Sequence, residues 1–111
     1  MKGVNLMIGI SVLITKYISD DPQPGIVECQ LFDAYGNEWV FQDKTAVFSS
    51  PNLDVSSDYP QPGVIACEII KQWQDVNGRE LVSVNTERPW GVETLTGASR
   101  FDVLRSQIIE I

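Results

Sequence analysis

PQPGIVEC at Pro22–Cys29 returns as PQPGVIAC at Pro60–Cys67. Five of these eight positions are identical, and two more exchange Ile with Val. A second match follows, DAYGNEWV at Asp33–Val40 against DVNGRELV at Asp75–Val82. The separation is 38 residues in the first match (60 − 22) and 42 in the second (75 − 33), so the second copy carries four extra residues. We therefore expect one structural unit to occur twice in the chain.

Each copy has the pattern of a β-hairpin. Gln-Pro-Gly is typical of a type II turn, in which Pro sets φ at the first central position and Gly takes the positive φ that follows. This predicts turns at Pro24-Gly25 and at Pro62-Gly63, each followed by a strand of alternating apolar residues. A second turn then begins with an Asp that bonds the backbone. The residues of these second turns are Asp33 and Gly36 in copy one, and Asp75, Asn77 and Gly78 in copy two.

The remaining segments complete a predicted all-β domain of six to seven short antiparallel strands over residues 1–111. The regular spacing of turn signals indicates a small antiparallel barrel, or a barrel-like sandwich, built around an internally duplicated hairpin. A long first strand favours the barrel. The predicted order is a first strand at 4–18, hairpin copy one at 22–48, a linker loop at 49–59, hairpin copy two at 60–87 and a terminal hairpin at 88–111.

Three details of this prediction are specific enough to be checked. The return strand of copy one is expected to resume at Ala46–Phe48 after a kink at Asp43-Lys44. The four extra residues of copy two predict a longer or bulged hairpin. The terminal hairpin is expected to use Val92–Thr94 as its first strand, with a tail from Ser106 onward that is either a strand or a short helix.

The composition is that of a globular protein with an acidic surface. The chain has 111 residues, 43% of them hydrophobic, and carries 15 acidic against 8 basic residues, for a net charge of −7. Affinity for nucleic acid comes mostly from clustered Lys and Arg, and the eight basic residues here are scattered. The charge therefore disfavours nucleic acids and anionic membranes, and it favours basic protein partners.

The N-terminal apolar stretch Val4–Ile14 loosely resembles a signal peptide. Thr15-Lys16-Tyr17 follows it instead of a small-residue cleavage site, and its apolar residues alternate as in a strand. The stretch is also too short to span a bilayer. We therefore expect the first strand here, no transmembrane segment and a cytoplasmic protein.

No group points to catalysis, a metal or a cofactor. The chain has no His, which removes the commonest general base and metal ligand. Cys29 and Cys67 take equivalent places in the two copies and are expected to be small buried hydrophobes, with a disulfide between them left open. A carboxylate-based enzyme would use Asp33 or Asp75, but both begin turns, where a structural role accounts for them.

The aromatic residues offer the best candidate interaction surface. Trp73 falls within the four extra residues and stands between Gln72 and Gln74, whereas Trp90 lies where Pro and Gly interrupt the chain. Exposed Trp side chains dominate the energetics of protein interfaces. The candidate surface consists of Trp73, Trp90, Tyr59 and Arg88, and the alternative is that all three Trp residues are structural.

These observations favour a non-catalytic, acidic protein-binding module, such as an inhibitor, an immunity-type protein or an assembly accessory protein. Its expected partner is another protein, possibly a basic one. One alternative is an OB-like barrel that binds a small ligand or single-stranded nucleic acid. A carboxylate-based enzyme ranks below both, and self-association into a homodimer remains open.

Overall fold

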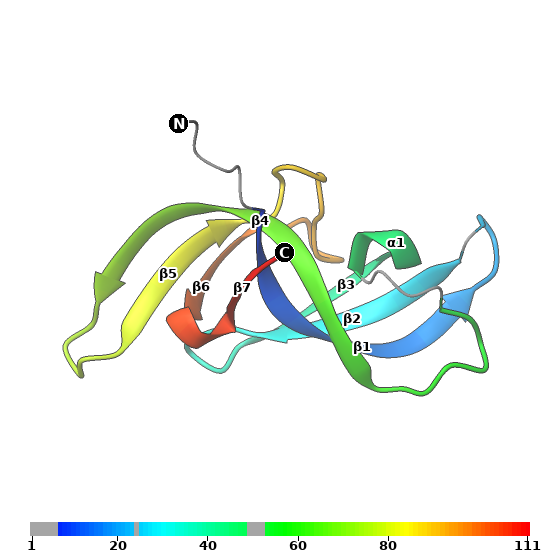
Figure 1. Cartoon of the computed structure of the whole chain (residues 1–111), viewed down its shortest axis with the longest axis horizontal. Coiled ribbons are helices and arrows are strands. Elements are labelled where there is room, and N and C mark those ends of the chain that lie inside the picture. The colour runs from blue at the N-terminus through cyan, green and yellow to red at the C-terminus, as the bar shows by residue number, and fades with distance from the viewer. Residues whose placement is uncertain (1–6, 24, 49–52) are drawn as a thin grey trace.

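The computed structural model describes residues 7–23, 25–48 and 53–111, and within these ranges it contains seven strands, one helical turn and one 3-10 turn (Figure 1). Every strand pairing is antiparallel, and the sheet is strongly curled into a half-barrel. This confirms the predicted all-β class and the number of strands. The elements are β1 (Ile8–Ser19), β2 (Ile26–Phe32), β3 (Glu38–Lys44), α1 (Thr45–Phe48), β4 (Gln61–Gln74), β5 (Glu80–Asn85), β6 (Arg100–Leu104), η1 (Arg105–Gln107) and β7 (Ile108–Glu110).

Strand β1 lies at the centre of the sheet, whose order is β3-β2-β1-β4-β5-β6. The first four strands form a Greek key, because β4 returns to lie beside β1 after the β1-β2-β3 meander. One edge of β1 pairs with β4 over Ile8–Ile14. The other edge is shared, with β2 along Leu13–Ser19 and β7 along Ile8–Ile10. The two hairpins, β2–β3 and β4–β5, therefore lie on opposite sides of β1.

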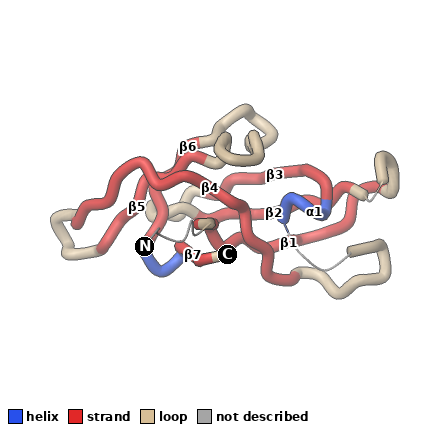
Figure 2. Tube along the Cα trace, turned by 45° about the horizontal axis from the view of Figure 1, so that its top comes forward, coloured by secondary structure: helices blue, strands red, loops and turns tan. Residues whose placement is uncertain are grey.

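Strand β4 changes partner halfway along its length. Gln61–Cys67 pairs with β1, and Glu68–Gln74 pairs with β5. A register shift between Ile69 and Lys71 marks a bulge just after this change. Of the two alternatives predicted for the second hairpin, the bulge is confirmed, whereas its ladder of six residue pairs is no longer than the seven pairs of β2–β3. Because bulges increase the local bend of a strand, β4 can leave one half of the sheet and enter the other, as Figures 1 and 2 show.

The core fills the inside of this curl with the apolar face of each strand. Alternation places one set of side chains inward, and α1 contributes Phe48, which is fully buried. The ring of Phe101 packs edge-on against Phe41 at 5.7 Å and against Trp39 at 5.2 Å between centroids. The core includes Ile10, Val12, Ile14, Val27, Cys29, Leu31, Ile65, Val82, Val84, Val92 and Val103.

The predicted turn at Pro62-Gly63 is wrong. Both residues belong to β4, where Pro62 lies opposite Leu13 and Gly63 opposite Val12. The reason is that β1 supplies a ladder for this copy of the motif. In the first copy Gly25 does have a positive φ of 123°, and its amide donates to the Pro22 carbonyl oxygen at 2.9 Å. Pro24 lies outside the described residues.

Two predicted strands are also corrected. Ala46–Phe48 belongs to α1, and β3 continues through Asp43 and Lys44 instead of kinking there. The helical turn inserts Phe48 into the core, which outweighs the strand pattern. Val92–Thr94 is not a strand, because Val92 is held by Thr86, whose carbonyl oxygen accepts from the Val92 amide at 3.0 Å.

The terminal region therefore differs from the predicted hairpin at 88–111. Strand β6 pairs with β5, and the tail forms η1 followed by β7, which joins β1. The first strand was predicted at 4–18, and β1 begins at Ile8 and ends at Ser19, one residue beyond the predicted end, with residues 4–6 outside the described ranges. In the linker predicted at 49–59, the described residues 53–59 contain no strand.

We predict that Gly63→Ala lowers the free energy of unfolding by about 1–3 kcal/mol, as overpacking of a core does. A Cβ at this position would lie 2.8 Å from both Ile14 Cδ1 and Cγ1 and 3.0 Å from the carbonyl oxygen of Phe48. Ile14 is fully buried and has little room to move. Urea unfolding of the purified protein measures the change.

The matched comparison is Gly63→Ala combined with Ile14→Val, which removes Ile14 Cδ1. The double variant should lose less stability than the sum of the two single variants, because one of the two close contacts is gone. Additive losses, or a change below about 0.5 kcal/mol for Gly63→Ala alone, would contradict this packing argument.

Candidate functional site

The four residues of the candidate interaction surface lie in three separate regions. Trp73 is near the end of β4, whereas Tyr59 precedes its start, so roughly 45 Å of strand contour separates them. Trp90 and Arg88 share the turn that follows β5. The structure therefore keeps Arg88 near Trp90 and brings neither Trp73 nor Tyr59 to them.

Trp73 and Tyr59 are both engaged by their own surroundings. The Nζ atom of Lys71 lies 4.7 Å from the centroid of the Trp73 ring, and Trp73 stands opposite Leu81, which is only 2% exposed. The Tyr59 hydroxyl donates to the Asp54 carbonyl oxygen at 2.7 Å, and its ring packs against the core. Both aromatic side chains thus have contacts within the chain, and Trp73 also lines a hollow of about 280 Å³ together with Gln72, Gln74 and Arg105.

Trp90 lies between two hollows, and 60% of it is exposed. One hollow of about 550 Å³ is lined by Ile8, Cys67, Ile69, Pro89 and Glu68, and the other, of about 500 Å³, runs along the start of β4. Met7 and Trp90 line both hollows. We call this region the Trp90 surface, and its residues are Met7, Pro62, Val64, Trp90, Ile109 and Ile111.

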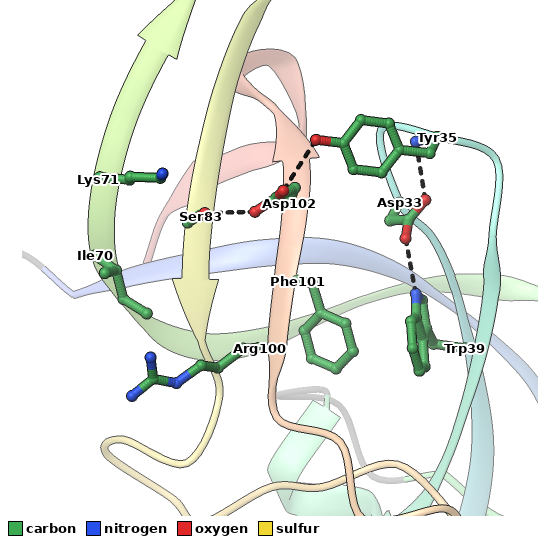
Figure 3. Close-up of a pocket in the computed structure, with 9 residues that line it drawn as sticks. All are labelled: Asp33, Tyr35, Trp39, Ile70, Lys71, Ser83, Arg100, Phe101 and Asp102. Atoms are coloured by element: carbon green, nitrogen blue, oxygen red, sulfur yellow. Dashed lines mark hydrogen bonds between the residues drawn. The ribbon is translucent and has the colours of Figure 1, made fainter.

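A different kind of cleft, of about 540 Å³, lies between the β2–β3 turn and the face of β4-β5-β6 (Figure 3). Lys71, Ser83 and Asp102 occupy adjacent positions across the three strands, so register alone places them in one row. Besides the bond from the Tyr35 hydroxyl to Asp102, two hydrogen bonds of the Ala34 backbone connect this turn to β6 and to the β4–β5 turn. The Ala34 amide donates to the Asp102 carbonyl oxygen at 2.8 Å, and Arg79 Nη1 donates to the Ala34 carbonyl oxygen at 2.9 Å.

Both carboxylates in this cleft are held by neutral donors. Asp102 accepts from the Ser83 hydroxyl and, at 2.9 Å, from the Tyr35 hydroxyl. Asp33 accepts from the amides of Tyr35 and Asn37 at 2.9 Å and from Trp39 Nε1 at 3.0 Å. Both carboxylates therefore accept hydrogen bonds from groups of the same chain.

These bonds set the ionisation of the Asp33 carboxyl. Partial burial alone would raise its pKa, but the bonds from Trp39 and from the amides of Asn37 and Tyr35 outweigh that effect, and the pKa falls below its ordinary value of 3.8. In the same cleft, the bond to Asp102 raises the pKa of the Tyr35 hydroxyl. Asp33 is therefore a charged structural anchor of its turn at neutral pH.

Among the residues that the structure describes, the two cations of the cleft, Lys71 and Arg100, have no carboxylate partner. In the described part of the chain two ion pairs form, Lys16 with Glu28 at 3.8 Å and Arg79 with Asp75 at 2.8 Å. Figure 3 shows Lys71, Ile70 and Arg100 on one side of the cleft and the Tyr35, Asp33 and Trp39 group on the other. Ser83, Asp102 and Phe101 lie between them.

The other groups considered for chemistry lie apart from this cleft. Asp75 bonds the amides of Asn77 and Arg79 in its own turn, at 2.9 Å each, so it anchors the β4–β5 turn as Asp33 anchors the β2–β3 turn. Cys29 and Cys67 are both buried and free. Burial raises the pKa of the Cys67 thiol to about 11 and that of Cys29 further, which keeps both protonated.

Within residues 7–23, 25–48 and 53–111 no cluster of three or more potential ligands could hold a metal ion. Over the same residues, no helix is long and apolar enough to cross a membrane. Comparison with protein-family models finds no match, and comparisons with curated proteins and with solved structures find no significant match. The geometry of the chain therefore carries the functional argument.

Most residues of the Trp90 surface and of the cleft could not be identified from the sequence. The Trp90 surface includes Met7, Ile109 and Ile111 because β7 pairs with the start of β1. No local sequence pattern predicts that pairing. Lys71, Ser83 and Asp102 are separated by more than ten residues in the chain and meet through strand register. The turn aspartate Asp33 was the single cleft residue with a sequence signal.

We predict that Asp33→Asn destabilises the protein by about 1–2 kcal/mol at pH 7, because an amide cannot accept all the donors that the carboxylate satisfies. The folded-state pKa is lowered, so this stability is fully present above pH 3.8 and is lost as the pH falls through the folded-state value. Urea unfolding at pH 7 and near pH 3 should show the gap to wild type shrinking. Asp58→Asn, on an exposed loop, is the control, and a gap that grows in acid would contradict the assignment.

Proposed function

We propose that this chain is a non-catalytic protein-binding module that contacts its partner through the Trp90 surface. The observation that carries this proposal is the exposure of Trp90 between two largely apolar hollows. Exposure of a large aromatic side chain and its apolar neighbours to water is unfavourable. Contact with a partner that buries them lowers the free energy. Met7 and Ile111, which are 39% and 58% exposed, extend the same apolar area.

The charge of the surroundings supports a partner of defined chemistry. Glu68 lines one hollow, Glu110 stands between Ile109 and Ile111 in the chain, and Glu87 begins the turn that carries Trp90. Arg88 is the one basic residue in that turn. With a net charge of −7 for the whole chain, a complementary partner presents an apolar group framed by Lys and Arg.

The same charges disfavour a homodimer through this surface and an OB-like barrel that binds single-stranded nucleic acid. A two-fold homodimer through this surface would bring Glu68 and Glu110 of both copies into one interface, and each chain already carries −7. In an OB-like barrel, the face of strands 2 and 3 would hold single-stranded nucleic acid. Here β2 and β3 carry Glu28, Glu38 and Asp43, which would repel phosphates.

We predict that Trp90→Ala weakens partner binding by at least about 30-fold, as truncation of an interface hot spot does. Trp73→Ala is the matched control, since it removes the same side chain near the far end of β4. Partners recovered from the native source by the wild-type chain are identified by mass spectrometry and purified. Each is then titrated calorimetrically with wild type, Trp90→Ala and Trp73→Ala.

The proposal is supported by a one-to-one complex that Trp90→Ala loses, that Trp73→Ala retains and that weakens as salt increases. Equal losses from both variants, or unchanged affinity with Trp90→Ala, would contradict it. Light scattering of the pure chain tests the homodimer: a dimer that Trp90→Ala dissociates would replace the partner with a second copy.

A further inference from the structure

We propose that the cleft between the β2–β3 turn and β6 is a binding site for a small organic carboxylate with a planar apolar body. The site lies apart from the Trp90 surface and does not depend on the proposed protein partner. Its volume of about 540 Å³ falls within the range of small-molecule sites.

The carboxylates and the cations of the cleft differ in whether the chain itself already supplies their hydrogen-bond partners. Its two carboxylates, Asp33 and Asp102, already accept hydrogen bonds from hydroxyl, indole and amide donors of the chain. Among the described residues, its two cations, Lys71 and Arg100, have no carboxylate within 4.0 Å, although the chain holds almost twice as many acidic as basic residues. Lys71 has its Nζ atom over the Trp73 ring, a contact that uses no N–H acceptor, so Lys71 and Arg100 both keep donors for a ligand, and these select an anion.

The charged side chains that line the cleft favour an anion with a single negative charge. The ionised lining groups are Lys71 and Arg100 against Asp33 and Asp102, so the cleft is neutral before a ligand enters. A carboxylate adds one negative charge and fits the planar fork of an Arg guanidinium. A phosphate monoester would bring a second negative charge beside Asp102, which makes it the less favourable ligand.

The aromatic side chains that line the cleft favour a ligand with a flat, apolar body. Phe101 and Trp39 pack edge-on at 5.2 Å, and the bond from Trp39 Nε1 to Asp33 holds the indole in place. The Tyr35 ring, which is 56% exposed, is held by the bond of its hydroxyl to Asp102. Because these rings are fixed before binding, a flat ligand can contact them without the cost of ordering them.

Figure 3 shows the cations and most of the aromatic rings on opposite sides of the cleft. Lys71 and Arg100 lie on the β4 side of the cleft, and Trp39 and Tyr35 lie on the side of the β2–β3 turn, with Phe101 between them. Ile70, which is 43% exposed, adds an apolar contact beside the cations. Figure 3 shows Lys71 pointing across the cleft and the Arg100 guanidinium apart from it, beside Ile70. A carboxylate bound by Lys71 would therefore direct its apolar body toward Tyr35 and Trp39, with Arg100 attracting it from a second position.

The test uses indole-3-acetate as the probe and the neutral indole-3-acetamide as its matched comparison. Each is titrated into the ¹⁵N-labelled chain, and the indole N–H signals of the three Trp residues are followed by NMR. We expect the acid to bind and to shift the Trp39 signal, whereas the amide binds on the order of tenfold more weakly.

Substitutions assign the binding to the cleft. Lys71→Gln and Arg100→Gln should each weaken the acid on the order of tenfold and leave the amide unchanged. The matched controls are Lys16→Gln and Arg88→Gln, whose side chains lie outside the cleft and which should bind as wild type does. Trp90→Ala should also bind normally, which separates this site from the proposed protein interface.

Three results would overturn the proposal. They are equal affinity for the acid and the amide, unchanged affinity in the Lys71→Gln, Arg100→Gln double variant, and shifts confined to Trp90. Tighter binding of phenyl phosphate than of indole-3-acetate would also reject a carboxylate as the ligand. All substituted residues but Trp90 are charged and exposed, and a wild-type-like spectrum of each variant shows that the fold is kept.

Discussion

The exchange of partners along β4 is the constraint on which the rest of the structure depends. Its first half completes the ladder of β1, and its second half begins the ladder of β5. Because one continuous backbone serves both, the two halves of the sheet cannot lie flat, and the curl that encloses the core follows. The bulge after Ile69 lets the strand bend there, and beyond it every residue of β4 except the half-buried Trp73 is exposed.

The fold class could be predicted from the sequence because alternation and turn residues are local signals. The hairpins β2–β3 and β4–β5 follow directly from them. The failures have a common physical cause, which is that tertiary pairing overrides a local preference. Gln-Pro-Gly makes a turn at Gly25, where φ is positive, and a strand at Gly63, where β1 lies alongside. Likewise, Phe48 gains more from burial through a helical turn than from continuing β3.

The sites could be predicted only where a single residue carried the signal. Trp90 was identified from its place at a chain break, and Asp33 from its place at the start of a turn. The grouping of residues around them depends on register, which brings Lys71 beside Ser83 and Asp102, and on the C-terminal strand β7, which brings Ile109 beside β1. Register is a property of the whole sheet, so composition and spacing within one segment cannot reveal it.

The pairing of β7 with β1 also brings the two ends of the described chain together. The Ile111 amide donates to the Met7 carbonyl oxygen at 2.8 Å, beside Trp90. A short linker could therefore join these ends in a circular permutant whose new termini open in the β4–β5 turn, at Val76–Gly78, with every strand ladder intact. Such a chain would carry fused tags and reporters at the β4–β5 turn, at the other end of β4 from the residues that line the Trp90 surface.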